Sequence, residues 1–271
     1  MARIRVNGVE LAYEVEGSGP PLALVHGSWT DRHGWDRVTG GLARDLTVVR
    51  YDRRGHSESE RVPGTVRDDV QDLAALIEAL DLVPAHIACS SYGGVIGFHL
   101  AASSPELLRS LVSHEPPLTR LLPDEHRGGR LVEDLDADEE AVIKQIEGGD
   151  HEGAARRFVD EIAFGPGAWQ QLPEALRTTF VRNAATYPEE QRDPESRWVD
   201  LEALRRFERP VLLTQGGSSP TWFGAVIERL AEVLPTVSRH LYRGAGHMPQ
   251  GTHADEYVDV VRGFLHEAAE G

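Results

Sequence analysis

The residues best suited to chemistry lie in one short turn, His86-Ile-Ala-Cys-Ser-Ser-Tyr-Gly-Gly94. An apolar run leads into small residues and then into a helical stretch, the pattern of a strand that turns sharply into a helix at a nucleophile. Such a turn needs small side chains two positions before and two after the nucleophile. Ser91 meets this need with Cys89 and Gly93, whereas Ser90 would place a tyrosine at the second flank. We predict Ser91 as the nucleophile; a small-residue turn that only opens a buried helix is the alternative.

A serine hydroxyl needs an imidazole to accept its proton, and that imidazole needs a carboxylate to hold its tautomer. His247 is the predicted base, because it follows the last predicted strand in the glycine-rich loop Gly244-Ala-Gly-His247. It also comes last in the chain, as the order nucleophile, acid, histidine requires. His253 is an alternative base, but it lies next to Thr252, a predicted helix N-cap residue.

The carboxylate is harder to place. In triads with this order the acid often follows the strand that here corresponds to Pro210–Thr214, yet no acid occurs between Glu208 and Glu228. Either the triad is incomplete or the acid comes from the preceding strand end, where Glu115 stands in His114-Glu-Pro-Pro117. We choose Glu115.

Backbone N–H groups can stabilise the negative charge that develops on a carbonyl oxygen under attack. Ser28 follows a glycine at the end of a buried strand, and Tyr92 follows the nucleophile, so their N–H groups are the predicted oxyanion hole. Trp29, Trp169 and Met248 are predicted to contact the substrate, since each neighbours a catalytic element or lies in an inserted segment.

The elements that position these residues alternate between short apolar runs and helical patterns, which indicates an α/β protein with a mostly parallel sheet covered by helices on both faces. The predicted strands are Arg3–Val6, Glu10–Glu16, Leu22–Val25, Leu46–Asp52, Ala85–Ser90, Leu108–Val112, Pro210–Thr214 and Arg239–Tyr242. A helix is predicted from Thr65, with Asp68 completing a capping pair, and others lie at Phe223–Leu234 and at the C-terminal end. Ligands bind at the carboxyl ends of the strands in such sheets, where the candidate residues lie.

Residues 118–207 interrupt this alternation with helical, charged and aromatic segments. We predict that they form an inserted helical cap, and that residues 1–117 and 208–271 form the core. The predicted cap helices are Glu139–Gly148, Gly153–Phe164 and Pro173–Ala185.

The composition and charge of the chain limit the classes of partner that the protein can bind. The chain has 271 residues and a formal net charge of −16, which argues against nucleic acid. No apolar run is long enough to cross a membrane, and the N-terminus lacks the pattern of a signal peptide, so we expect a cytoplasmic protein. The single cysteine and the spacing of the histidines predict no metal site, and the chemistry needs no cofactor. The expected partner is a small neutral or apolar substrate, and a homodimer is compatible with these features.

The whole chain resembles the α/β-hydrolase superfamily. The resemblance is carried by His26-Gly27, Asp52 with Arg54-Gly55, the turn at Ser91 and Gly246-His247. A narrower similarity is to fungal lactonases that open the macrolactone zearalenone, with counterparts at Cys89-Ser-Ser91, His114-Glu-Pro-Pro117, Ala168-Trp-Gln170 and Ser219-Pro-Thr221. It implies the α/β-hydrolase fold, Glu115 as the acid and Trp169 against the substrate. The sequence departs from these lactonases at Tyr92 and at His26-Gly27.

Three functions follow as hypotheses. The first is a serine hydrolase that cleaves a carboxylic ester or lactone through an acyl-enzyme on Ser91. The second is a cofactor-independent lyase or oxygenase that uses His247 as a base without an acyl-enzyme. The third is a non-catalytic ligand-binding homologue, suggested by the lack of an acid after Thr214.

Overall fold

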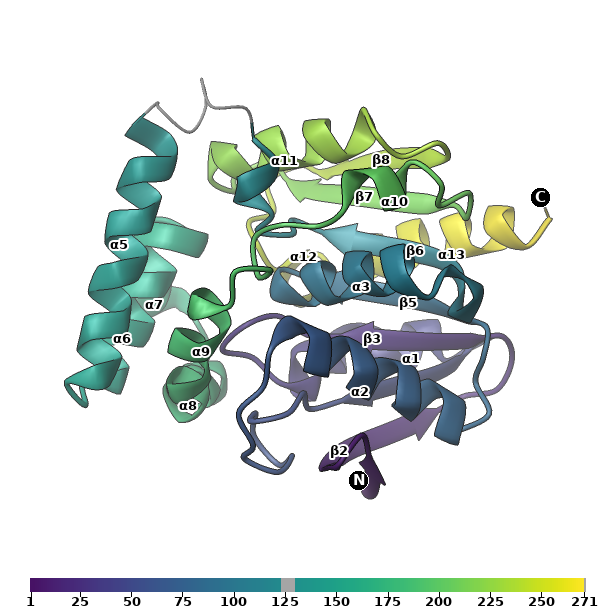
Figure 1. The fold of residues 1–271 in the computed structure, drawn as a ribbon, viewed down its shortest axis with the longest axis horizontal. Helices are drawn as coiled ribbons and strands as arrows, with labels where there is room; N and C mark the ends of the chain where they lie inside the picture. Colours follow the sequence, from purple (N-terminus) through teal and green to yellow (C-terminus); the bar gives the residue numbers. More distant parts are fainter. Residues whose placement is uncertain (123–129, 271) are drawn as a thin grey trace.

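The computed structural model describes residues 1–122 and 130–270. An eight-stranded sheet runs through the molecule in the order β1-β2-β4-β3-β5-β6-β7-β8 (Figure 1). The strands are β1 (Ala2–Val6), β2 (Val9–Glu16), β3 (Pro21–Val25), β4 (Thr47–Tyr51), β5 (Ala85–Ser90), β6 (Leu108–His114), β7 (Val211–Gly216) and β8 (Val237–Tyr242). Strand β2 pairs antiparallel with β1 and β4, and the neighbours from β4 to β8 are parallel. The predicted fold class and strand number are therefore confirmed.

Helices cover both faces of the sheet because side chains alternate along each strand. Ala23 and Val25 of β3 join one apolar cluster with α2 (Val66–Ala79), α3 (Tyr92–Ser103) and α11 (Thr221–Ala231). Leu22 and Leu24 join the other, with α1 (Asp36–Leu42) and α13 (Ala254–Glu270). The predicted capping pair is confirmed, since the Thr65 side chain accepts from Asp68 N–H and the Asp68 carboxylate accepts from Thr65 N–H.

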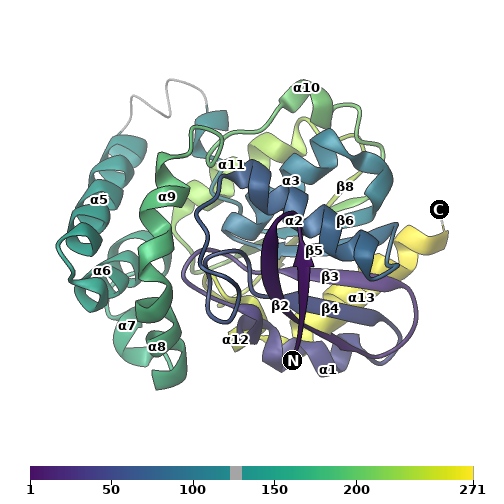
Figure 2. The ribbon, with the colours of Figure 1, turned by 60° about the horizontal axis from the view of Figure 1, so that its bottom comes forward.

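The inserted segment supplies a separate group of helices beside the sheet. It contains η3 (Thr119–Leu121), α5 (Arg130–Glu147), α6 (His151–Arg157), a π-helical turn η4 (Phe158–Ala163), α7 (Ala168–Gln171), α8 (Glu174–Asn183), η5 (Ala184–Thr186), α9 (Tyr187–Arg192) and α10 (Leu201–Leu204). Helices α5–α9 stand together in Figures 1 and 2, while α10 lies apart from them and contacts α3. We call the helices α5–α9 the cap.

The domain boundaries at 118 and 207 remain a prediction, and residues 123–129 of the predicted cap and 271 of the predicted core lie outside the described residues. The remaining elements are η1 (Arg32–Trp35), η2 (Pro105–Leu107) and α12 (Pro249–Thr252). None of the helices in the described ranges combines the length and the apolar character that crossing a bilayer requires.

Candidate active site

Ser91 lies in the sharp turn between β5 and α3, with φ 54° and ψ −125°. This left-handed backbone is rare for a residue with a side chain and is costly unless its surroundings enforce it. The neighbouring glycines explain how it is held: a Cβ at Gly93 would collide with the Val25 carbonyl oxygen, and one at Gly94 would lie 2.6 Å from Ser113 Oγ. Cys89 is tolerated where glycine is usual because its Sγ packs against Gly97 in α3.

Glu115 follows directly after β6 and reaches the histidine of the last loop. Its Oε2 lies 2.6 Å from His247 Nδ1, and both side chains are buried. The loop after β7 completes the carboxylate's contacts, since Gly216 N–H donates to Oε1 at 2.7 Å and Ser219 Oγ donates to Oε2 at 3.0 Å. The loop that lacks an acid therefore holds the acid of the preceding strand.

Aromatic rings fix the plane of the His247 imidazole. Phe223 of α11 stacks on it with ring centroids 4.4 Å apart, and Phe164 meets it edge-on at 5.7 Å. Because Nδ1 faces Glu115, Nε2 is the nitrogen left for proton transfer. His247 and Ser91 line the same cavity.

The electrostatics of the pair favour an ionised carboxylate. Burial alone would raise the pKa of Glu115, but His114 and His247 more than offset it and hold the pKa below its usual value. Burial lowers the pKa of His114, so this imidazole is neutral at physiological pH. Glu115 can therefore stabilise the imidazolium that forms when His247 accepts a proton.

The segment after β3 lies directly against the nucleophile. A Cβ at Gly27 would be 2.8 Å from Ser91 Cβ, so the backbone leading to Ser28 passes within contact of the serine. Ser28 N–H donates to none of the residues that the structure describes. Tyr92 N–H is the first amide of α3, and the first amides of a helix have no acceptor within it. Both placements suit the predicted oxyanion hole, which remains a prediction.

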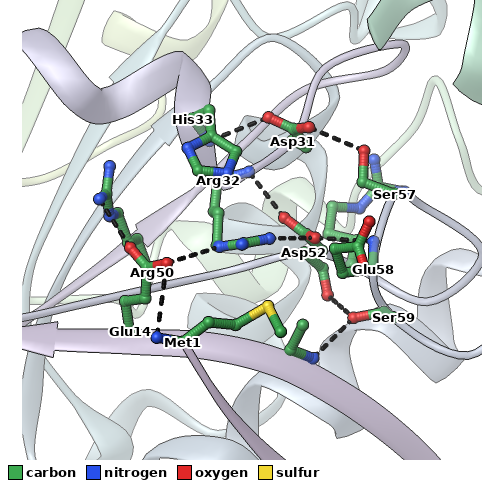
Figure 3. Close-up of polar contacts among 12 residues, drawn as sticks. Met1, Glu14, Asp31, Arg32, His33, Arg50, Asp52, Ser57, Glu58 and Ser59 are labelled. Carbon is green, nitrogen blue, oxygen red and sulfur yellow. Dashed lines mark hydrogen bonds and ion pairs between the residues drawn. The ribbon is translucent and has the colours of Figure 1, made fainter.

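A buried ionic network anchors the segment that follows β3 (Figure 3). Arg32 donates from its backbone N–H to Asp52 Oδ1 at 2.9 Å and from Nη1 to Asp52 Oδ2 at 2.6 Å, and its Nε donates to Glu14 Oε1 at 3.2 Å. Asp31 accepts from Ser57 Oγ at 2.7 Å. The backbone from 26 to 32 is thus anchored to β2 and to the loop after β4.

The cap binds the same segment through Asn183 of α8, a residue that the sequence analysis missed. Its Nδ2 donates to the carbonyl oxygens of Thr30 at 3.0 Å and Trp29 at 3.3 Å, and its Oδ1 accepts from Ser57 N–H at 2.9 Å. Trp29 has a φ of 66°, unusual for a bulky residue, so these bonds stabilise a strained backbone.

Two hollows meet at the candidate site. The inner cavity has a volume of about 20 Å³, room for about one water molecule. Its lining residues are His26, Gly27, Ser28, Thr30, Gly34, Trp35, Ser90, Ser91, Phe158, Phe164, Phe180, His247, Met248 and Gln250. The outer groove has a volume of about 930 Å³ and runs between the core and the cap helices α7 and α8. The two share Gly34, Phe164, His247 and Met248, so a molecule in the groove adjoins His247.

The predicted substrate-contacting residues take different places. Met248 lines both the inner cavity and the outer groove. Trp29 is fully buried and is absent from both linings; its ring stacks at 5.0 Å on Phe158, which does line the cavity. Trp169 is also buried and is absent from both linings, and its backbone N–H donates to Asp160 Oδ1 at 2.8 Å. The roles of the two tryptophans in binding remain predictions.

A second buried cluster beneath the cap also escaped the sequence analysis. Arg53 places its guanidinium 4.5 Å from the centre of the Tyr92 ring and pairs with Asp69 and with Glu190 of α9, each at 2.8 Å. Burial raises the pKa of Glu190 despite this pairing. The cluster joins the residue after the nucleophile to the cap.

Metal ligation has one geometric candidate among the described residues. Ligand atoms of His114, Glu115 and His247 lie within 4.8 Å of one another. The 2.6 Å separation of Glu115 Oε2 and His247 Nδ1 is a hydrogen-bond distance, so these two ligand atoms bind each other. The expectation that the protein uses neither metal nor cofactor remains a prediction.

The chain matches a known protein family over most of its length. The Alpha/beta hydrolase family matches residues 22–260. The chain belongs to this family. An uncharacterized hydrolase of Bacillus subtilis, YraK, is 39% identical over 44% of this chain, and the match spans 45% of that relative, less than half its length. Zearalenone hydrolase of Bionectria ochroleuca is 27% identical over 94% of this chain and 93% of its own.

Solved structures agree on the fold. A thermophilic esterase from Thermogutta terrifontis covers 99% of this chain and 99% of its own with a TM-score of 0.79, at 22% identity. The predicted membership of the α/β-hydrolase superfamily is confirmed by the family match over residues 22–260. The candidate site lies at the carboxyl ends of β3, β5, β6, β7 and β8, as ligand sites in such sheets do.

Proposed function

We propose that this α/β hydrolase is a serine hydrolase that cleaves carboxylic esters or lactones through an acyl-enzyme on Ser91. The observation that carries the proposal is the bond of 2.6 Å between Glu115 and His247, whose ring lines the cavity of Ser91. A buried carboxylate that orients an imidazole beside a serine can activate the serine hydroxyl as a nucleophile.

In the proposed reaction, Ser91 Oγ attacks the carbonyl carbon of the substrate while His247 Nε2 takes the hydroxyl proton. The negative charge on the carbonyl oxygen is stabilised by the N–H groups of Tyr92 and Ser28. Collapse of this intermediate expels the alcohol, which receives the proton from His247 and leaves Ser91 acylated. A water molecule, deprotonated by His247, then hydrolyses the ester and restores the free serine.

The shape of the two hollows supports a substrate whose bulk stays outside the nucleophile's cavity. The inner cavity holds little more than a carbonyl group, whereas a groove of about 930 Å³ lies in the range of small-molecule sites. Its cap side is mostly apolar, with Phe164, Leu172 and Leu176 among the lining residues. A macrolactone is a suitable first candidate, since the relative that matches nearly the whole chain carries the name zearalenone hydrolase. Phe164 lines both the inner cavity and the groove, so its side chain lies where a ring carbonyl would pass between them.

The experiment is turnover of zearalenone and of a panel of simple esters, followed by liquid chromatography and mass spectrometry. We expect Ser91→Ala to abolish turnover. Glu115→Gln keeps the shape of the acid and should lower kcat by about 10⁴-fold, as loss of a triad acid does elsewhere. Near-full activity of Glu115→Gln would overturn the assignment of the acid. Unreacted zearalenone with active simple esters would confine the proposal to non-macrocyclic substrates.

A further inference from the structure

A second histidine lies behind the proposed acid. His114 is the last residue of β6 and is fully buried. Its Nδ1 lies 2.9 Å from Thr214 Oγ1 of β7, and its Nε2 lies 3.4 Å from Glu115 Oε2. Nε2 makes no hydrogen bond of full geometry with any of the described residues. A buried polar atom in this state calls for an explanation, because most such atoms in native proteins are paired.

The contacts select one tautomer of this ring. Burial lowers the pKa of His114, so the imidazole carries one proton. If the proton were on Nδ1, the lone pair of Nε2 would face a carboxylate oxygen at 3.4 Å, which is repulsive. If it is on Nε2, the Thr214 hydroxyl rotates to donate to Nδ1, and Nε2–H faces Glu115 Oε2. The second arrangement satisfies both nitrogens as far as the geometry permits.

We propose that His114 is a positioning residue that acts on the catalytic histidine through Glu115, with the dipole of its Nε2–H 3.4 Å from the carboxylate oxygen that also binds His247. The inference rests on the proposed serine hydrolase function. Oε2 faces His247 Nδ1 at 2.6 Å, Ser219 Oγ at 3.0 Å and His114 Nε2 at 3.4 Å. Each donor withdraws negative charge from this oxygen, so each limits how strongly Glu115 attracts the proton of His247.

The groups around His114 allow its effect on His247 to be measured. The ring of His247 lies 5.9 Å from that of His114, and the ring of Tyr242 on β8 lies 6.1 Å away. Burial raises the pKa of Tyr242 above its usual value, so this phenol stays neutral. Thr214 is uncharged. Among the described groups that face His114 here, Glu115 is held ionised, so a change at His114 acts on how strongly this carboxylate attracts the proton of His247.

The test replaces His114 and follows His247 by NMR of histidine-labelled protein, with His247→Gln used to assign its ring signals. His114→Phe keeps the ring and removes the donor. We expect the pH midpoint of the His247 signals to rise by up to about one pH unit, because a contact at 3.4 Å without full hydrogen-bond geometry is worth at most as much as a full hydrogen bond to a charged group. Thr214→Val, which frees the tautomer, should raise the midpoint by less, and His114→Gln, which restores an N–H donor, should bring it back toward the wild-type value.

A second readout is the rate at which a fluorophosphonate labels Ser91 as a function of pH. In His114→Phe the acidic limb of this profile should move to higher pH together with the NMR midpoint, while the plateau at high pH changes by less than about tenfold. Wild-type protein that resists the fluorophosphonate would overturn the proposed function, yet the NMR midpoint would still test the coupling.

His86 supplies a matched control. It is also a buried histidine with Nδ1 bonded to a hydroxyl of the next strand, Ser110 Oγ at 2.7 Å, but it lies at the opposite end of β5. His86→Phe should reduce stability without moving the His247 midpoint. A midpoint that stays within about 0.2 pH units or falls in both Thr214→Val and His114→Phe would overturn the proposal. If His114→Phe does not fold, Thr214→Val decides alone.

Discussion

Asn183 of α8 offers the sharpest test of how the cap supports catalysis. The change Asn183→Leu keeps nearly the same volume and removes every hydrogen bond of the side chain. It leaves Ser57 N–H and Thr30 C=O, now paired at 2.9 and 3.0 Å, without partners in a buried site. Each unpaired buried group costs about 1–3 kcal/mol. We therefore expect the free energy of unfolding to fall by about 2–4 kcal/mol.

The same change should also impair the reaction. Trp29 and Thr30 follow Ser28 directly, and the φ of 66° at Trp29 relaxes when its carbonyl is released. A displaced oxyanion donor costs about 10²-fold or more in kcat. Urea unfolding measures the first effect, and ester hydrolysis under conditions where the variant is fully folded measures the second. Asn183→Asp loses the donors to Trp29 and Thr30 and places a carboxylate against their carbonyl oxygens in a buried site, so it should impair kcat and cost at least as much stability as Asn183→Leu.

Arg182 provides the matched control, because it is the neighbouring residue on α8 and bonds to the same loop. Its Nη2 donates to Ser57 O at 2.7 Å and to Glu58 Oε1 at 2.6 Å, and it makes no bond to Trp29 or Thr30 among the described contacts. Arg182→Leu should cost less than about 1 kcal/mol and leave kcat unchanged, as for other exposed ion pairs. If Asn183→Leu matched the wild type in both stability and kcat, the cap would have no part in holding the oxyanion segment.

Two further predictions concern single side chains. Gly27→Ala should lower kcat/KM by about 100-fold in a folded protein, because its Cβ would sit 2.8 Å from Ser91 Cβ and move the segment away. Gly40→Ala in α1, whose Cβ would meet nothing within 4 Å, is the control, and equal activities of the two variants in an esterase assay would contradict the argument. Burial raises the pKa of Glu139 in α5 from its ordinary 4.5 to about 7, despite its ion pair with Arg197. The pKa of this carboxyl is higher in the folded protein than in the unfolded chain, so the stability that the group contributes is present below pH 4.5 and is lost as the pH rises to 7. The free energy of unfolding of the wild type should therefore fall relative to that of Glu139→Gln by about 3 kcal/mol over that interval. A difference that stays constant with pH in urea titrations would refute this prediction.

The core could be predicted from the sequence because its signals are local. Apolar runs gave the strands to within a residue or two, and Thr65 with Asp68 marked the start of α2. The turn at Ser91 was readable because small residues are required at fixed offsets, and Glu115 and His247 because each follows a strand. The contact between Glu115 and His247 agrees with the role predicted for Glu115, and the acid-free loop after β7 proved to hold this carboxylate through Gly216 and Ser219.

The cap was harder to predict because its features depend on distant partners. The segment 153–164, expected as one helix, is an α-helix followed by the π-helical turn Phe158–Ala163, which packs Phe158 and Ile162 inward. Asn183 and Glu190 carry no local signal, since their partners Ser57 and Arg53 are 126 and 137 residues away in the chain. Glu139 lies among other acidic residues of α5, a composition typical of an exposed helix face, yet it is buried against Arg197.

The central claim is that Ser91 becomes covalently acylated. The most direct measurement is intact-protein mass spectrometry of the protein quenched during turnover of an activated ester, followed by peptide mapping. We predict a mass increase equal to one acyl group on the peptide that contains Ser91, greater accumulation of this adduct if deacylation is impaired, and no adduct in Ser91→Ala. Turnover of the ester with no acyl adduct at Ser91, and with activity retained in Ser91→Ala, would contradict the account.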